Sequence, residues 1–172
     1  MYFELNMTSQ IMTPRLVLRR WRNEDIDPLY QVSSDPKVMK YYPAPLTLEQ
    51  TEAMVRKIEE GFERYGFGLF CCELRTSKEV IGFVGLQRVP FEAHFTPAVE
   101  IGWRIKAAHW NQGFATEAAL ASLDFGFEDC GLNEVVAMTV PNNQASIRVM
   151  EKLGMNTSDE DRFENPRMRR AT

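Results

Sequence analysis

A strand, a glycine-containing loop and a helix follow one another directly in the second half of the chain, and this unit most constrains the fold. Over Val99–Ile105, apolar side chains alternate with charged or small ones, which predicts a strand with two different faces. The loop that follows ends in Gly113, and small side chains then line one side of a helix over residues 114–128. The unit indicates a domain that mixes strands with helices.

Other patterns place further elements around this unit. Thr47 and Gln50 have capping-box spacing, which predicts a helix that begins there and runs to Tyr65. We also expect strands over residues 15–19, 68–74, 80–89 and 134–140, and helices over residues 23–32 and 143–153. No repeat or linker interrupts this order, so we expect a single α+β domain over residues 1–172.

Composition excludes several classes of protein. The formal charge of -4 and the pI near 5.3 lack the basic footprint of nucleic-acid binding. No segment has the apolar length of a membrane span, and the first residues lack the pattern of a secretory signal. The three cysteines are an odd number, which argues against a disulfide framework and favours the cytoplasm. With two histidines and no CxxC or HExxH spacing, the sequence predicts no metal site.

The turn from the loop into the helix at Gly113 has the features of an anion-binding site. The first N–H groups of a helix lack intrahelical partners and carry partial positive charge. Glycine has no Cβ to block the approach of a ligand, so a pyrophosphate would fit. An ordinary turn that happens to contain glycine is the alternative. Neither a P-loop nor a dinucleotide fingerprint is present, which excludes those two phosphate-binding classes.

Three stretches in the second half of the chain carry a family resemblance. They are VEIGW at 99–103, WNQGFATEA at 110–118 and NNQASIRVMEKLGM at 142–155. In order and spacing they resemble the GNAT superfamily of N-acetyltransferases, most closely its RimJ/RimL-like branch of ribosomal-protein N-terminal acetyltransferases. The resemblance implies the GNAT-type acyl-CoA N-acyltransferase fold. In that fold a mixed, mostly antiparallel twisted sheet has helices on both faces, and it splays between residues 99–105 and 134–140 to admit the cofactor.

The resemblance also implies acetyl-CoA as co-substrate. The pyrophosphate would bind backbone N–H groups at Asn111, Gln112, Gly113, Phe114, Ala115 and Thr116. The pantetheine arm would pair like an extra strand with the backbone of Trp103, Arg104 and Ile105, and Asn143 would also contact it. One departure is Trp110, which stands where the family pattern has Gln or Arg. Because the phosphate contacts are made by backbone, this change should weaken binding only modestly.

Catalysis requires a base, because a protonated amine has no lone pair with which to attack a thioester. Glu100 matches a carboxylate that many relatives use for this purpose, although it could instead pair with Arg104 on the same strand face. A backbone N–H of this strand would hold the oxyanion. Met150 stands where many relatives have a tyrosine acid. Ser146, one turn earlier, is our candidate substitute; a serine on the helix surface or a cap partner is the alternative.

The acceptor is expected to be a primary amine, most simply the N-terminal α-amine of a protein or peptide. A small-molecule amine, such as an antibiotic, a polyamine or an amino acid, is an alternative, and so is a catalytically silent acyl-CoA-binding module. Three carboxylates within residues 158–161 could attract a cationic acceptor, or could form only a solvated loop.

A short C-terminal tail raises the question of assembly. After Gly154 the sequence predicts at most one strand, over residues 156–163, which would leave an unpaired edge on the strand expected at 134–140. Soluble proteins avoid such edges. We therefore expect a homodimer that covers the edge; an incomplete chain is the alternative.

Overall fold

The computed structural model describes residues 10–166 and contains a five-stranded antiparallel sheet in the order β1-β2-β3-β4-β5. The strands are β1 (Gln10–Met12), β2 (Leu16–Arg19), β3 (Leu69–Leu74), β4 (Val80–Arg88) and β5 (Val99–Ile105). The longer helices are α1 (Ile26–Ser33), α2 (Leu48–Tyr65), α3 (Phe114–Asp124) and α4 (Gln144–Lys152). Short helical turns are η1 (Asn23–Asp25), η2 (Ala107–His109), η3 (Phe125–Asp129) and η4 (Asp159–Asp161).

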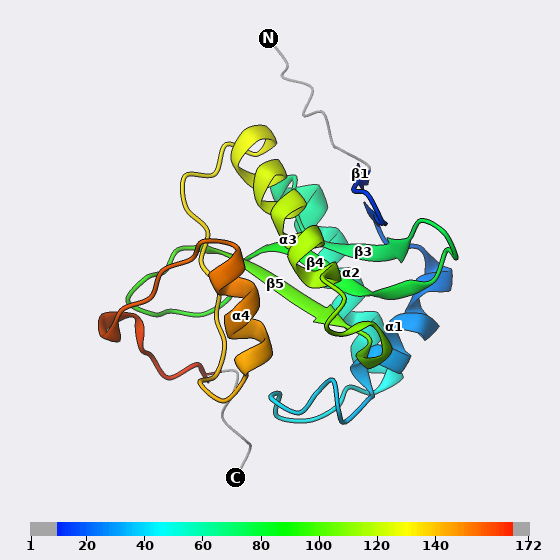
Figure 1. Cartoon of the computed structure of the whole chain (residues 1–172), viewed down its shortest axis with the longest axis horizontal. Coiled ribbons are helices and arrows are strands. Elements are labelled where there is room, and N and C mark those ends of the chain that lie inside the picture. The colour runs from blue at the N-terminus through cyan, green and yellow to red at the C-terminus, as the bar shows by residue number, and fades with distance from the viewer. Residues whose placement is uncertain (1–9, 167–172) are drawn as a thin grey trace.

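Helices cover both faces of the sheet, with α2 behind it and α3 in front in the view of Figure 1. For this reason β3 and β4 are buried along most of their length. From α2 the side chains of Val55, Ile58 and Phe62 enter the core, and α3 packs closely on β4 and β5 through small residues such as Ala118 and Ala119. The apolar residues that alternate along the sequence thus pack into one core, with a layer of helices on each side.

Most of the expected elements are present. Thr47 caps α2: its hydroxyl accepts from the Gln50 N–H at 3.1 Å, and the Gln50 side chain accepts from the Thr47 N–H at 2.9 Å. The strands expected over residues 15–19, 68–74, 80–89 and 99–105 correspond to β2 through β5. The α+β fold with helices on both faces is confirmed. Within residues 10–166, no helix combines the length and the apolar character that crossing a membrane requires.

The prediction of a strand over residues 134–140 is wrong. In that segment only Val136 pairs with β5, through a parallel bridge opposite Glu100. The carbonyl of Val136 accepts from the Ile101 N–H at 2.8 Å, and its N–H donates to the Val99 carbonyl at 2.9 Å. Apolar, β-branched residues favour an extended backbone here, but a strand also needs a neighbour in register along its length. The predicted splay therefore lies beside a single bridge.

The strand that residues 156–163 could have supplied is absent, and residues 168–172, which the sequence predicts to be too short for a second strand, lie outside the described part of the chain. Residues 156–163 contain no strand and instead form the single turn η4. Because residues 134–140 are not a strand either, the unpaired strand edge that motivated the homodimer is not present in the expected form.

Candidate active site

A cleft of about 1100 Å³ opens beside β5. Its walls come from the loop before α2, from α2 itself, from β4 and β5, and from the segment that leads into α4; lining residues from these parts include Tyr41, Met54, Gln87, Glu100, Met138 and Ser146. The Tyr41 hydroxyl donates to the Asn142 carbonyl at 3.0 Å, which joins the loop before α2 to the turn before α4. The cleft is thus bounded by segments that are distant in sequence.

Strand β5 presents both of its faces to this cleft. Arg104 contacts Ser33 of α1 and Met54 of α2, so its side chain lies on the face that those helices cover. Trp103 points to the opposite face, where its indole Nε1 donates to Ser146 Oγ of α4 at 3.3 Å. Both side chains line the cleft. The cleft therefore passes from one face of the sheet to the other, next to the point where pairing with Val136 ends.

Glu100 lies in the wall of the cleft and is only 5% exposed. Its Oε1 accepts a hydrogen bond of 2.6 Å from Nε2 of Gln87, the residue opposite it on β4. The alternative expectation was an ion pair with Arg104, and no such pair occurs among the described residues: Arg104 Nη1 donates to Ser33 Oγ at 3.0 Å instead. A neutral amide therefore orients the carboxylate.

Ser146 and Asn143 lie together at the start of α4. Asn143 is the N-cap, and its Oδ1 accepts from the Ser146 N–H at 3.3 Å. The Ser146 hydroxyl accepts a hydrogen bond from the Trp103 indole. Ser146 lines the cleft, and Met150 is not among the residues that line it. Ser146 is thus a cap partner through its backbone and also places a hydroxyl on the cleft through its side chain.

The turn before α3 has the backbone that an anion cradle requires. Asn111 and Gly113 have φ angles of +58° and +83°, and the helix begins directly afterwards at Phe114. The Glu117 N–H, which donates to the Gly113 carbonyl at 3.0 Å, makes the first bond of the helix. The N–H groups of residues 114–116 precede that bond, so they have no partner within the helix. Residues 111–113 are exposed, which leaves the turn accessible to a ligand.

Arg15 braces this turn and was not found by sequence reasoning. Its Nη1 donates to the Gln112 carbonyl at 2.8 Å, and its Nε donates to Glu117 Oε2 at 2.7 Å. Partial burial acts to raise the pKa of Glu117, but hydrogen bonds from Thr13 and Arg15 prevail and hold this pKa below its ordinary value. No local pattern could reveal Arg15, because it precedes β2 and reaches α3 only in the folded chain.

The backbone N–H and carbonyl groups of Trp103, Arg104 and Ile105 do not all point toward the same side of β5. In the antiparallel pairing with β4, Arg104 stands in a hydrogen-bonded pair with Phe83, so its N–H and carbonyl lie within the sheet. Trp103 and Ile105 turn their backbone groups toward the open edge, and the Ile105 carbonyl accepts from Trp110 Nε1 at 2.7 Å. A ligand along this edge could therefore form hydrogen bonds with the backbone of Trp103. From Arg104 it could contact only the side chain.

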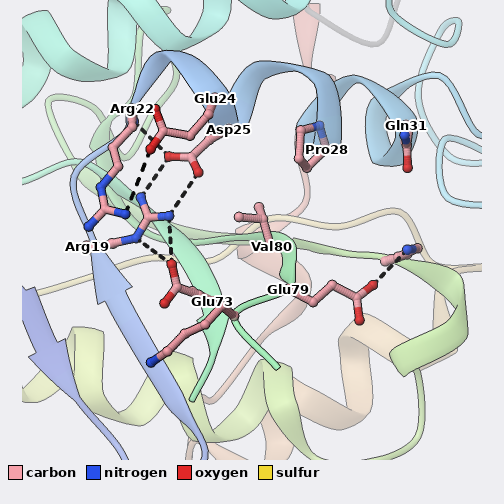
Figure 2. Close-up of a pocket in the computed structure, with 11 residues that line it drawn as sticks. Arg19, Arg22, Glu24, Asp25, Pro28, Gln31, Glu73, Glu79 and Val80 are labelled. Atoms are coloured by element: carbon pink, nitrogen blue, oxygen red, sulfur yellow. Dashed lines mark hydrogen bonds and ion pairs between the residues drawn. The ribbon is translucent and has the colours of Figure 1, made fainter. Parts of the chain in front are cut away.

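A second, smaller pocket of about 380 Å³ contains none of the predicted site residues. Figure 2 shows Arg19 there, between Asp25 and Glu73. Arg19 makes two hydrogen bonds to Asp25, at 2.7 and 2.9 Å, and its Nε donates to Glu73 at 2.9 Å. The charges of this cluster are buried and mutually paired, which is the arrangement of a structural ion cluster.

The cysteines lack the properties of nucleophiles. Cys71 and Cys72 are completely buried in β3, and this burial raises the pKa of both thiols. Burial also raises the pKa of Cys130. Because the thiolate is the reactive form, none of the three is activated for attack on a thioester.

Comparison with known proteins agrees with this geometry. The family model of the acetyltransferase (GNAT) domain matches residues 15–156. The uncharacterized protein YkkB of Bacillus subtilis is 34% identical over 155 residues, which span 90% of this chain and 89% of YkkB. The structure of a GNAT-family acetyltransferase from Bacillus anthracis is 32% identical, covers 86% of this chain and 83% of its own, and superposes with a TM-score of 0.72.

An acetyltransferase structure from Agrobacterium tumefaciens shares 26% identity and covers 97% of this chain and 93% of its own, with a TM-score of 0.81. The resemblance thus extends over nearly the whole described fold. The chain belongs to the GNAT family of acetyltransferases, enzymes that use acetyl-CoA and an amine acceptor.

Proposed function

We propose that this enzyme transfers the acetyl group directly from acetyl-CoA to an α-amine bound in the β5 cleft, with Glu100 as the general base. The observation that carries the proposal is the position of Glu100, a buried carboxylate in a cleft that passes through the sheet beside the open edge of β5. A thioester entering from one face can meet an amine entering from the other at this point.

For acetyl-CoA we propose a path along that open edge. The pyrophosphate binds the backbone N–H groups of residues 111–116, where the first turn of α3 supplies partial positive charge. The pantetheine arm runs beside Trp103 and Ile105, in the place that a sixth strand would occupy, and Asn143 contacts it from the start of α4. The single bridge at Val136 supports this path, because it leaves the rest of the β5 edge unpaired by residues 137–140.

The chemistry is an attack of the neutral amine on the thioester carbonyl. Glu100 takes the amine proton, directly or through water, while the oxyanion forms beside a backbone N–H of β5. The carbon–sulfur bond then breaks and the thiolate leaves. A thiol pKa of about 8.5 makes thiolate a tolerable leaving group, so Ser146 needs to supply only modest help as a proton donor.

Amine acidity favours an α-amine as the acceptor. An α-amine has a pKa of about 7.7–8.0 and a lysine about 10.4, so far more α-amine is already neutral at pH 7. One carboxylate base is adequate for the former and a weak match for the latter. The fold is shared with RimL, described as a ribosomal L7/L12 α-N-protein acetyltransferase, at 19% identity. That identity bears on fold alone, so the peptide N-terminus rests on the pKa argument.

An acceptor screen tests this function. The enzyme is given acetyl-CoA together with peptides bearing free N-termini, N-blocked peptides with a lysine, or small amines, and release of free thiol is followed. Turnover confined to free N-termini supports the proposal. Turnover only with lysine side chains or polyamines contradicts it, and thiol release with none of them would indicate a silent acyl-CoA-binding module.

Two further expectations remain proposals. A cytoplasmic location rests on the three free cysteines. The homodimer now has less support, since residues 134–140 form no strand edge; light scattering should report about twice the chain mass of 19.9 kDa if it forms. A monomer at micromolar concentration would remove the homodimer without affecting the proposed chemistry.

A further inference from the structure

Two arginines in the described part of the chain are deeply buried, and their guanidinium groups have different kinds of partner. Arg19 makes ion pairs with both Asp25 and Glu73. Arg104 is 8% exposed and pairs with no carboxylate of residues 10–166. Its Nε is buried without any hydrogen-bond partner in the same part of the chain. Burying a charge is costly unless it is paired, so Arg104 has the profile of a group that awaits a ligand.

The surroundings of Arg104 hold its guanidinium in a fixed position. The guanidinium carbon lies 4.5 Å from the Tyr42 ring centroid and 5.0 Å from the Phe83 ring centroid. Ser33 accepts one of its hydrogens at 3.0 Å. Aromatic rings interact with a guanidinium through its faces and cannot satisfy the N–H groups at its edge. The unsatisfied donor belongs to a side chain that lines the cleft.

The charge of the cleft points in the same direction. Lys57, Arg88 and Arg104 line it, whereas Glu100 is the only acidic residue among its described lining. An excess of positive charge is unfavourable for an acceptor that is purely cationic, such as a polyamine. It favours an acceptor that brings negative charge along with its amine.

We infer that the acceptor carries a carboxylate, which Arg104 binds while the amine lies near Glu100. This inference rests on the proposed function. Both side chains are on one face of β5, four residues apart, which is about 13 Å along a strand. Between them Gly102 has no side chain, and an added Cβ would meet only Leu69 Cδ2, at 3.9 Å. An extended acceptor can therefore lie over Gly102 with its two ends at the two charged residues.

Two sources could supply the same chemistry. The carboxylate could belong to an acidic side chain near the N-terminus of a peptide, or it could be that of a small amino acid. Matched acceptor pairs distinguish them: a peptide with Asp at its second position against the same peptide with Asn, and the α-amide of glutamate against the α-amide of glutamine.

The test compares the wild type with Arg104→Met, and uses Arg56→Met as the matched control because Arg56 is an exposed arginine of α2 that does not line the cleft. In the wild type, kcat/KM should favour the carboxylate-bearing member of at least one pair by about tenfold or more, as expected for a charge-assisted contact. Arg104→Met should abolish this preference, and Arg56→Met should retain it. No preference in the wild type, or an unchanged preference in Arg104→Met, overturns the inference.

A binding measurement separates this inference from the proposed function. Calorimetric titration with the same probes, in the presence of CoA, needs no turnover. Carboxylate-dependent binding that is lost in Arg104→Met supports the role of Arg104 even if no thiol is released. Equal binding of both members of each pair contradicts it even if acetyl transfer is observed.

The melting temperature distinguishes a ligand-binding Arg104 from an arginine that only stabilises the fold, because replacing the latter should lower it. Removing an unpaired buried charge should leave the melting temperature of Arg104→Met unchanged or higher. If that variant does not fold, the wild type alone still decides: its melting temperature should rise with the carboxylate-bearing probes and not with the matched probes that lack a carboxylate. Equal rises with both members contradict the inference.

Discussion

Gln87 Nε2 lies 2.6 Å from Glu100 Oε1, so a side chain of β4 orients the proposed base on β5. The two residues are direct cross-strand neighbours, and the sheet register therefore sets this contact. A base held by a neutral amide keeps its orientation without an arginine partner on its own strand. The contact also survives in a glutamine variant, whose carbonyl can accept the same hydrogen bond.

Glu100→Gln should therefore lower kcat/KM by roughly 10²–10⁴-fold at neutral pH, because it retains shape and removes basicity. Activity should recover partly at higher pH, where more of the amine is already neutral. Steady-state kinetics between neutral and alkaline pH provide the measurement, and Glu92→Gln, an exposed carboxylate, is the control. A loss below threefold with an unchanged pH profile would assign Glu100 a structural role.

Gly113→Ala should weaken acetyl-CoA binding. An added Cβ lies 3.3 Å from Arg15 Nη2, and the φ of +83° is unfavourable for any side chain. Gly131→Ala is the matched control, since its φ is +66° and nothing lies within 4 Å of its Cβ. Both variants should lose roughly 1–2 kcal/mol of stability from the backbone alone. Only Gly113→Ala should raise the KM for acetyl-CoA, on the order of tenfold; equal KM values in the two variants would place the pyrophosphate elsewhere.

Neutralising the acidic turn η4 should leave the acceptor KM unchanged at both low and high salt. The carboxylates of Asp159–Asp161 serve local contacts: Asp161 accepts from the Ser158 N–H at 2.6 Å, and Asp159 pairs with Arg162 at 2.9 Å. None of them lines the cleft. The variant replaces all three by their amides, and acceptor kinetics are compared at two ionic strengths. An acceptor KM that rises mainly at low salt would show that this turn steers the acceptor.

Glu117 should make stability depend on acidic pH. Its pKa is lowered in the folded protein, so its ionised form stabilises the fold above about pH 4.3, the ordinary glutamate pKa. That stabilisation is lost as pH falls through the lowered value. Glu117→Gln should therefore cost about 1–3 kcal/mol at pH 7 by urea unfolding, and less at acidic pH. The exposed Glu128→Gln is the control; a cost for Glu117→Gln that is independent of pH would contradict this role.

Local patterns predicted the elements whose determinants lie close together in sequence. Thr47 and Gln50 are three residues apart, so the start of α2 could be recognised from the chain alone, and the alternation along Val99–Ile105 similarly predicted β5. The prediction for residues 134–140 failed because what determines a strand there is distant in sequence. Their composition favours an extended backbone, but only tertiary structure determines whether a neighbour continues past Val136.

The site followed the same division. Glu100 and the turn at Gly113 were identified from motifs, whereas Arg15 could not be, because its contacts with Gln112 and Glu117 form only on folding. An ion pair between Arg104 and Glu100 had been the alternative to a catalytic role for Glu100, because the two share a strand face. In the structure its partners come from α1, α2 and the loop before α2, which the strand pattern does not describe.

The most direct measurement follows the acetyl group itself. Enzyme, labelled acetyl-CoA and a peptide with a free N-terminus are mixed, and the enzyme and the peptide are then analysed by mass spectrometry. Direct transfer predicts one acetyl group on the peptide α-amine for each free thiol released, with no label on the enzyme at any time and little product with Glu100→Gln. Label on an enzyme side chain before it reaches the peptide, or thiol release without an acetylated amine, would contradict direct transfer.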